Sequence, residues 1–172
     1  MAEPTVLREL EPPLLLNLRG DAGAEAFRAA VAGVLGVAPP AEPNTVAASD
    51  DIEILWLGPD EWLVAAPADK TDLTDRLDAA LAGLHHSLID VSQGRVVLEL
   101  EGPHARTVLA GAASVDLRPR ALGPGRCAQT PLARIPVVLQ AVDAPPRLRV
   151  FVRASFAPYV AEWLRGTIAE LA

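Results

Sequence analysis

Two spacings of apolar residues along the chain predict its secondary structure. At residues 96–100, Val96, Leu98 and Leu100 alternate with Val97 and Glu99, a period of two that is typical of a strand. Toward the end of the chain the apolar residues recur at helical spacing, which predicts a last helix with one buried face. The residues of that stripe are Phe156, Tyr159, Val160, Trp163, Leu164, Ile168 and Leu171.

Each half of the chain shows the same order of predicted elements. The first half has a strand at 14–18, a helix over 27–35 ended by Gly36, a hairpin of strands at 52–57 and 62–66, and a helix over 73–84. The second half has a strand at 96–100, a helix over 105–112, a hairpin of strands at 135–142 and 148–152, and the last helix. Segments 1–12 and 38–51 are polar or rich in proline and predict loops.

A short alignment supports an internal duplication. Residues 14–20 (LLLNLRG) match residues 96–102 (VVLELEG) in their apolar positions and in the final glycine. Each half would place two helices on one face of an antiparallel sheet, because the helices must bury their apolar stripes. We therefore expect an α+β fold that forms a single compact domain over residues 1–172, with similar halves at about 13–86 and 87–172.

Composition and charge narrow the range of partners. The chain has 172 residues, 51% of them hydrophobic and 4% aromatic, so its core is expected to be mainly aliphatic. Its net charge of −7 repels phosphate backbones and anionic lipids, which argues against nucleic acid and membrane partners. The N-terminus lacks a basic region, and the apolar run 14–16 is too short for a signal peptide or a membrane span. We expect a cytoplasmic protein.

Sequence motifs for catalysis are absent. The chain contains no GxGxxG, GxxxxGK[ST], CxxC, HExxH or GxSxG motif, and its single cysteine, Cys127, is expected to be a small buried residue. Distant residues could still converge, but we expect no catalytic, cofactor-binding or metal-ligating residue on this chain.

Two polar segments are candidates for a structural role or for contacts with a partner. In the turn at residues 90–95, Asp90 and Ser92 can bond local amides, and Arg95 can pair with a carboxylate. At residues 153–157, Arg153 ends a strand and Ser155 can cap the last helix. The alternative is that the two arginines bind carboxylates of a partner chain. The candidate residues are Asp90, Ser92, Arg95, Arg153, Ser155, Phe156 and Trp163.

These two segments, together with LGPDEWL at 57–63, GPxA at 102–105 and EWL at 162–164, resemble the gamma subunit of heterotetrameric sarcosine oxidase. The resemblance runs from about Leu14 onward. It implies a small subunit of a flavoenzyme that oxidatively demethylates sarcosine to glycine, forms hydrogen peroxide, and passes the one-carbon unit to tetrahydrofolate or releases formaldehyde. It also implies alpha, beta and delta partner subunits, with FAD, FMN and NAD on the larger ones, zinc on the smallest, and no cofactor on this chain.

The implied fold is similar to the folate-binding region of glycine-cleavage aminomethyltransferase. Asp90-Val91-Ser92 resembles an Asp-x-Ser segment of that enzyme, in which a histidine often follows, but here Gln93 follows. The region of its acidic motif, residues 132–138, contains no aspartate. We therefore expect a non-catalytic gamma subunit that docks on the large subunit and stabilises it. The alternatives are a stand-alone folate-binding or one-carbon transfer protein and a homodimeric scaffold.

Overall fold

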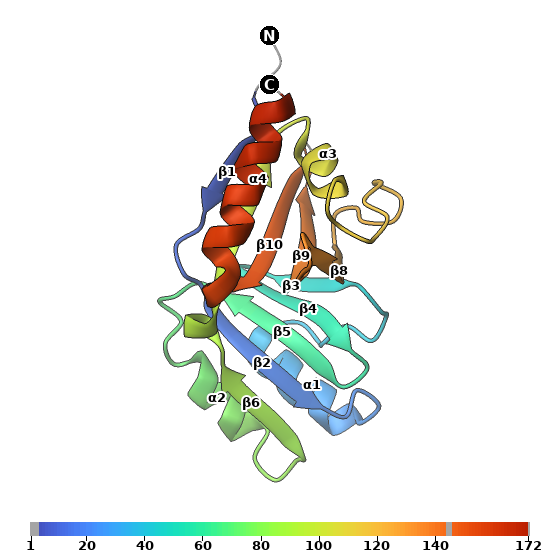
Figure 1. Cartoon of the computed structure of the whole chain (residues 1–172). Helices are drawn as coiled ribbons and strands as arrows, with labels where there is room; N and C mark the ends of the chain where they lie inside the picture. The colour runs from blue at the N-terminus through green and yellow to red at the C-terminus, as the bar shows by residue number, and fades with distance from the viewer. Residues whose placement is uncertain (1–3, 144–145, 172) are drawn as a thin grey trace. The chain divides into compact units, whose positions relative to one another are not determined.

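The computed structural model describes residues 4–143 and 146–171, and the chain divides into two compact units (Figure 1). The first unit is Pro12–Ser92. The second unit combines Met1–Glu11 with Gln93–Ala172, so the start of the chain belongs with its second half.

The first unit is an antiparallel sheet with two helices. Its elements are β2 (Leu14–Gly20), α1 (Glu25–Leu35), β3 (Val46–Ser49), β4 (Ile52–Gly58), β5 (Glu61–Ala66), α2 (Leu73–Ala80) and β6 (His86–Asp90), and the sheet order is β3-β4-β5-β2-β6. Alternate strand residues such as Leu16 and Ile54 pack on Phe27 of α1 and Leu77 of α2, all at most 1% exposed. Both helices therefore cover one face of this sheet, as Figure 1 shows.

The second unit repeats this plan. Its elements are β1 (Val6–Glu9), β7 (Arg95–Glu101), α3 (Ala105–Ala110), β8 (Arg126–Leu132), β9 (Ile135–Asp143), β10 (Arg147–Arg153) and α4 (Ala157–Leu171), and the sheet order is β1-β7-β10-β9-β8. Two 3-10 turns, η1 (Ser92–Gly94) and η2 (Ala154–Phe156), precede β7 and α4. Leu98 and Val150 of the sheet share one buried cluster with Val108 of α3 and Leu164 of α4.

The two sheet orders correspond strand by strand. If β2 is laid on β7, then β3-β4-β5-β2-β6 matches β8-β9-β10-β7-β1. The helix-facing leucines of the aligned segments agree as well, since Leu16 and Leu18 face the first core and Leu98 and Leu100 face the second. The predicted α+β class and the repeated architecture are therefore confirmed.

The last strand of each sheet differs in its origin. In the first unit β6 follows α2 and pairs with β2, whereas in the second unit β1 comes from the start of the chain and pairs with β7. The chain passes close to itself there, because a side chain at Gly102, which has φ +123°, would meet the backbone of Thr5. This placement puts Arg8 on the same sheet as β7 and β10.

Several sequence-based expectations need correction. Segments 1–12 and 38–51 are not only loops, because they contain β1 and β3, and the strands β6 and β8 were not anticipated. The helix expected over 73–84 ends at Ala80, and β6 begins at His86. β1, β3, β6 and β8 are edge strands, and edge strands are often short or carry charged residues and proline, as Arg8 in β1 and Pro131 in β8 show, so their apolar pattern is harder to recognise.

The boundary between the halves also shifts. The first unit extends to Ser92 rather than to residue 86, because β6 pairs with β2. That both units form a single compact domain stays a prediction. In the described residues, no helix is long and apolar enough to cross a membrane.

Candidate functional site

The Asp90–Ser92 turn ties the end of β6 to the start of β2. Ser92 donates hydrogen bonds to Asp90 Oδ1 from its hydroxyl (2.6 Å) and from its backbone N–H (2.9 Å). The Ser92 hydroxyl oxygen in turn accepts a hydrogen bond from the backbone N–H of Leu15 at 2.9 Å. The hydrogen bonds from the Ser92 side chain and backbone lower the pKa of Asp90 below its ordinary value. These bonds are of the local kind expected for Asp90, and whether the turn also contacts a partner chain stays a prediction.

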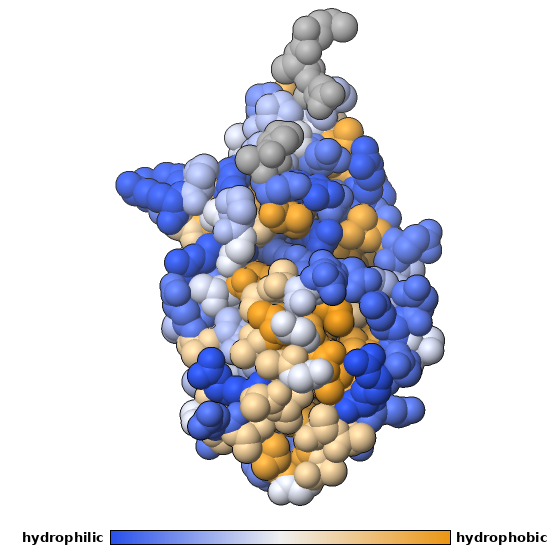
Figure 2. Space-filling model, turned by 180° about the vertical axis from the view of Figure 1, so that it is seen from behind, coloured by the Kyte–Doolittle hydropathy of each residue, from blue (hydrophilic) through white to orange (hydrophobic). Residues whose placement is uncertain are grey.

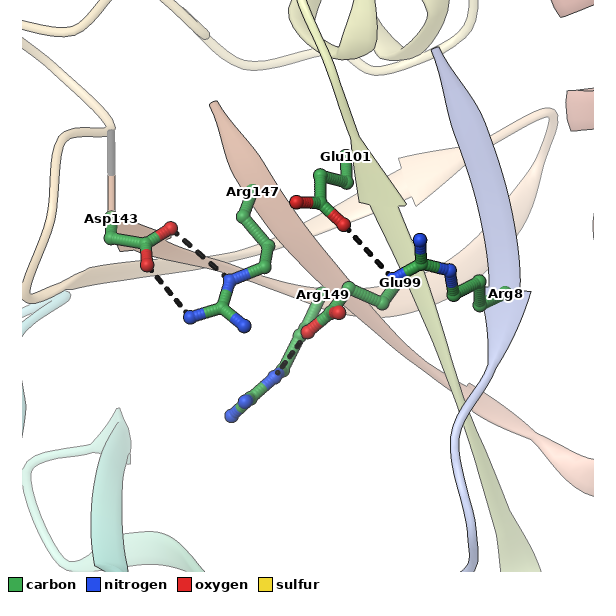
Figure 3. Close-up of polar contacts among 6 residues, drawn as sticks. All are labelled: Arg8, Glu99, Glu101, Asp143, Arg147 and Arg149. Carbon is green, nitrogen blue, oxygen red and sulfur yellow. Dashed lines mark hydrogen bonds and ion pairs between the residues drawn. The ribbon is translucent and has the colours of Figure 1, made fainter. Parts of the chain in front are cut away.

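The second unit carries a charged cluster on the face of its sheet opposite the helices (Figure 3). Arg147 and Arg149 of β10 project from this face, with Glu101 and Glu99 of β7 directly opposite them. We call the six residues of Figure 3 the charged face: Arg8, Glu99, Glu101, Asp143, Arg147 and Arg149.

The charged face is held by three ion pairs of different burial. Arg149 Nε lies 3.1 Å from Glu99 Oε2, and these side chains are 22% and 7% exposed. Arg147 binds both carboxylate oxygens of Asp143, at 3.2 and 2.7 Å, and this contact raises the pKa of Arg147. Arg8 pairs with Glu101 at 3.0 Å with both side chains largely exposed. Of these three pairs, Arg149–Glu99 is the best shielded from water, so removal of one of its two partners is expected to destabilise the second unit most.

The same face ends in a row that contains two arginines. Arg153, the last residue of β10, lies directly opposite Arg95, the first residue of β7. Both side chains line an open pocket of about 400 Å³. Its other lining residues are Gln129, Thr130, Pro131, Pro136, Val137 and Val138. A planar guanidinium can donate two parallel hydrogen bonds to one carboxylate, so this pocket is suited to an anionic group.

Helix α4 buries part of the predicted stripe, together with two alanines. Its buried residues are Ala157, Val160, Ala161 and Leu164, while Phe156, Tyr159 and Leu171 are 39%, 52% and 40% exposed. The expected stripe is therefore confirmed at Val160 and Leu164 and wrong at Phe156, Tyr159 and Leu171, while Ala157 and Ala161 lie on the buried face. Trp163 is partly buried against the core, as expected. Ser155 lies inside η2, before the first residue of α4, and not at a simple helix cap.

Tyr159 connects α4 to the turn between β8 and β9. Its hydroxyl donates a hydrogen bond to the carbonyl of Ala133 at 3.4 Å. Ala133 and Arg134 form that turn with positive φ angles of 47° and 72°. The exposed Tyr159 thus lies at the same end of the sheet as Pro131 and Pro136, which pair across this hairpin.

The first unit has a second pocket, of about 610 Å³, beside the start of β6. It is lined by Arg19, Gly20, Asp21, Asp60, His85, His86 and Ser87. The pKa of His86 is raised by a hydrogen bond to the carbonyl of Leu84 at 2.9 Å and, less strongly, by Asp78 at 3.2 Å. Within the described ranges 4–143 and 146–171, no three His, Cys, Asp or Glu residues are grouped so that they could hold a metal ion.

Cys127 is buried at 1% exposure in β8, as predicted. Figure 2 shows apolar surface gathered over the lower part of the face on which α1 and α2 lie. The outward residues of α1 include small ones such as Ala26, Ala29 and Gly33, and no polar group there suggests a chemical role.

The structure reveals residues that the sequence interpretation did not single out. Glu99 and Arg149 form the most buried ion pair of the charged face, and Arg8 reaches it from a segment predicted to be a loop. A glutamate inside an otherwise apolar strand is a signal that could have identified Glu99. Asp90 and Ser92 lie together and Arg95 and Arg153 lie together, whereas Phe156 is exposed and Trp163 is half-buried farther along α4.

Comparisons with known proteins agree on one family. The model of the "Sarcosine oxidase, gamma subunit family" matches residues 19–170. The sarcosine oxidase subunit gamma of an Arthrobacter species is 39% identical over 172 residues, which cover 99% of this chain and 83% of that protein.

Solved structures show the same relationship. A chain of the heterotetrameric sarcosine oxidase from Corynebacterium sp. U-96, solved in complex with pyrrole 2-carboxylate, matches with a TM-score of 0.90 and 38% identity over 96% of this chain and 84% of that one. The glycine cleavage system aminomethyltransferase T from Bartonella henselae matches with a TM-score of 0.73 and 18% identity, over 96% of this chain and 46% of that one. The latter likeness concerns the fold, and it confirms the fold expected from the sequence.

Proposed function

The chain belongs to the sarcosine oxidase gamma subunit family, and we propose that it works as the gamma subunit of a heterotetrameric sarcosine oxidase. It docks on the large subunit and stabilises it, while the oxidative demethylation of sarcosine takes place on other subunits. The observation that carries this proposal is the 38% identity and TM-score of 0.90 with a chain of such an oxidase, over 96% of this chain.

The proposal extends to the rest of the assembly. Its partners are the alpha, beta and delta subunits, with FAD, FMN and NAD on the larger subunits, zinc on the smallest, and the complex in the cytoplasm. The hydrogen bonds of the Asp90–Ser92 turn support a non-catalytic role, because both side chains are engaged in holding β6 against β2. The candidate contacts with partners are Arg95, Arg153, Phe156 and Trp163.

Reconstitution tests this function. The chain is co-expressed with the three other subunits of its own organism, and a parallel culture omits only this chain. We expect the chain to copurify in equal amount with the large subunit and to lengthen the half-life of sarcosine-dependent peroxide production on heating. The chain alone should produce no peroxide. Peroxide production by the chain alone, or its failure to associate with the other subunits, would contradict the proposal.

Two further measurements separate the alternatives. Titration of the isolated chain with tetrahydrofolate in a calorimeter is expected to give no heat, whereas micromolar binding would favour a stand-alone folate-binding or one-carbon protein. Light scattering of the isolated chain distinguishes a homodimeric scaffold, which would form a stable dimer without any other subunit.

A further inference from the structure

The edge strands of the two sheets differ in how their outer backbone groups are protected. β1 and β3 have only four residues each. β8 contains Pro131, and Ala113 pairs with Leu132 at its end. β6 has five residues and no lysine, arginine or proline. Short length, positive side chains, proline and cover by other segments keep an edge strand from pairing with another chain, so β6 is the least protected of these edges.

The hydrogen bonds between β6 and β2 show which backbone groups of β6 point outward. Val91 follows β6 directly, and its N–H donates to the carbonyl of Leu15 at 2.8 Å. Along an antiparallel pair, residues that bond to the partner strand alternate with residues whose N–H and C=O groups point away from it. Ile89 therefore bonds to β2, as Val91 does, while Leu88 and Asp90 present their backbone groups on the outer edge. Within the described residues, β6 pairs with β2 alone.

Ile89 gives this edge an apolar side chain. It is 55% exposed, the largest value among the large hydrophobic residues that the structure describes. It lies opposite Asn17, on the face away from the helices, whereas Leu88 packs against the core on the helix side. Side chains are closest where an antiparallel pair is not hydrogen-bonded, so a strand added antiparallel to β6 would bring a side chain directly against Ile89.

The charge of the first unit favours one kind of partner. Residues 12–92 include 13 acidic and 4 basic residues, a net charge of −9, whereas the rest of the chain has a net charge of +2. Asp90 at the end of β6 is exposed, and Asp78, with its side chain 72% exposed, contacts His86 at the start of β6. Pairing of β6 with β6 of a second copy would bring two acidic units together, while a segment with lysine or arginine is attracted.

We propose that an extended, positively charged segment of a partner subunit pairs with the outer edge of β6. Its backbone forms hydrogen bonds with the backbone groups of Leu88 and Asp90, and one of its apolar side chains packs on Ile89. In this mode of recognition the backbone bonds provide affinity, and the side-chain contact and the charge provide specificity. That the segment belongs to another subunit rests on the function proposed above.

Hydrogen exchange tests the added strand directly. In the isolated chain the outward amides of Leu88 and Asp90 should exchange about tenfold faster than those of Ser87 and Ile89, which bond to β2. In the purified four-subunit assembly we expect the exchange of Leu88 and Asp90 to slow by about tenfold or more, measured by mass spectrometry at single-residue resolution. Unchanged exchange on assembly would overturn the inference. Slow exchange that develops only as the isolated chain is concentrated would assign the edge to a second copy and would also overturn it.

Two lysine variants test the side-chain contact within the full assembly. Ile89→Lys removes the apolar contact and adds a positive charge, and Leu171→Lys makes the same change at a leucine of α4 that is 40% exposed. We expect Ile89→Lys to weaken association with the other subunits by about tenfold or more, and Leu171→Lys by less than about threefold. Ile89→Glu should lose less than Ile89→Lys, because its charge attracts the segment.

Circular dichroism of each isolated variant shows whether it folds, and the exchange measurement on the wild-type chain decides the question if Ile89→Lys does not. Equal affinities of folded Ile89→Lys and Leu171→Lys would overturn the inference while leaving the proposed function intact. A greater loss from Ile89→Glu would overturn the positive charge assigned to the segment. Failure of the wild-type chain to associate would refute the proposed function itself.

Discussion

The middle row of the face opposite the helices has different chemistry in the two units. In the first unit Asn17 of β2 lies opposite Leu63 of β5, which lies opposite Leu55 of β4, and both leucines are 0% exposed. In the second unit the corresponding row runs from Glu99 through Arg149 to Gln140. Two nearly identical sheet plans thus carry an apolar row and a charged row at the same place.

This difference separates what defines the fold from what can vary. The helix-facing positions are apolar in both units, with Leu18 in the first and Leu100 in the second, each fully buried. Burial of these side chains against the helices provides the main driving force for folding in each unit. The opposite face accepts either leucines or ion pairs, provided that each buried charge has its partner.

The largest expected effect is on the helix-facing side of β5. Trp62 lies opposite Leu18, just as Leu148 lies opposite Leu100. Trp62 stacks on Phe27 at a centroid distance of 5.8 Å and donates a hydrogen bond to the carbonyl of Pro40 at 2.9 Å. We expect Trp62→Ala to lower the free energy of unfolding by about 4 kcal/mol and Leu148→Ala by about 3 kcal/mol. Urea unfolding measures both; a larger loss from Leu148→Ala would contradict this ranking.

The next effect concerns the charged row itself. Glu99→Ala removes the carboxylate that pairs with Arg149, whose side chain is only 22% exposed, and should lower the free energy of unfolding by about 3 kcal/mol. Asn17→Ala, at the corresponding position of the first unit, removes one 2.8 Å hydrogen bond to Glu61 and should lower the free energy of unfolding by about 1 kcal/mol. Both losses are read from urea unfolding midpoints.

A double variant is the control for the charged row. Glu99→Leu with Arg149→Leu makes the second unit resemble the first, and its stability should stay within about 1 kcal/mol of the wild type. A double variant as unstable as Glu99→Ala would mean that the second unit depends on this ion pair for more than charge compensation.

A smaller effect distinguishes the edge strands β6 and β1. Ser92→Ala removes the hydroxyl that links Asp90 to Leu15 and should lower the free energy of unfolding by about 1 kcal/mol. Arg8→Ala removes the exposed Arg8–Glu101 ion pair and should lower it by about 0.5 kcal/mol or less. Thermal melting ranks the two variants. Equal losses would show that the half-buried hydroxyl gives β6 no advantage over β1.

The Ser92 variant also has a pH signature. The pKa of Asp90 is lowered in the folded chain, so its contribution to stability is present above the ordinary pKa of 3.8 and is lost as the pH falls through the lower folded value. Ser92→Ala should raise the pKa of Asp90, and the stability difference from the wild type should narrow on acidification. NMR titration of the Asp90 carboxyl carbon measures the shift, and an unchanged pKa would contradict it.

The smallest expected effect is at the start of β6. The raised pKa of His86 means that its contribution to stability is fully present below the ordinary value of 6.5 and is lost as the pH rises through the higher folded pKa. Asp78→Asn should lower the pKa of His86 and leave part of the shift, because the carbonyl of Leu84 remains. NMR titration of the imidazole tests this; complete loss of the shift would show that Asp78, and not the carbonyl, is the main cause.

Much of the fold could be predicted from local patterns. The apolar periods located β2, β4, β5, β7, β9, β10 and the helices α1 to α4, and the short alignment of β2 with β7 reflects positions that face equivalent cores. The hydrogen bonds from Ser92 to Asp90 lie within one turn and follow the local pattern, whereas the bond from the Leu15 N–H to the Ser92 hydroxyl joins residues 77 positions apart and was not anticipated. The buried stripe of α4 was predicted in part, since Val160 and Leu164 are buried, whereas Phe156 and Tyr159 are exposed and Ala157 and Ala161 are buried in their place.

The sequence by itself determined the apolar faces and hence the repeated strand, helix and hairpin order, because these depend on residues a few positions apart. Only the tertiary structure decided which strand completes each sheet and which charges meet. Arg8 reaches Glu101 across 93 positions, and Arg149 reaches Glu99 across 50. Strand register brings such residues together, and a shift of one residue would turn every side chain to the other face, so no local pattern specifies them.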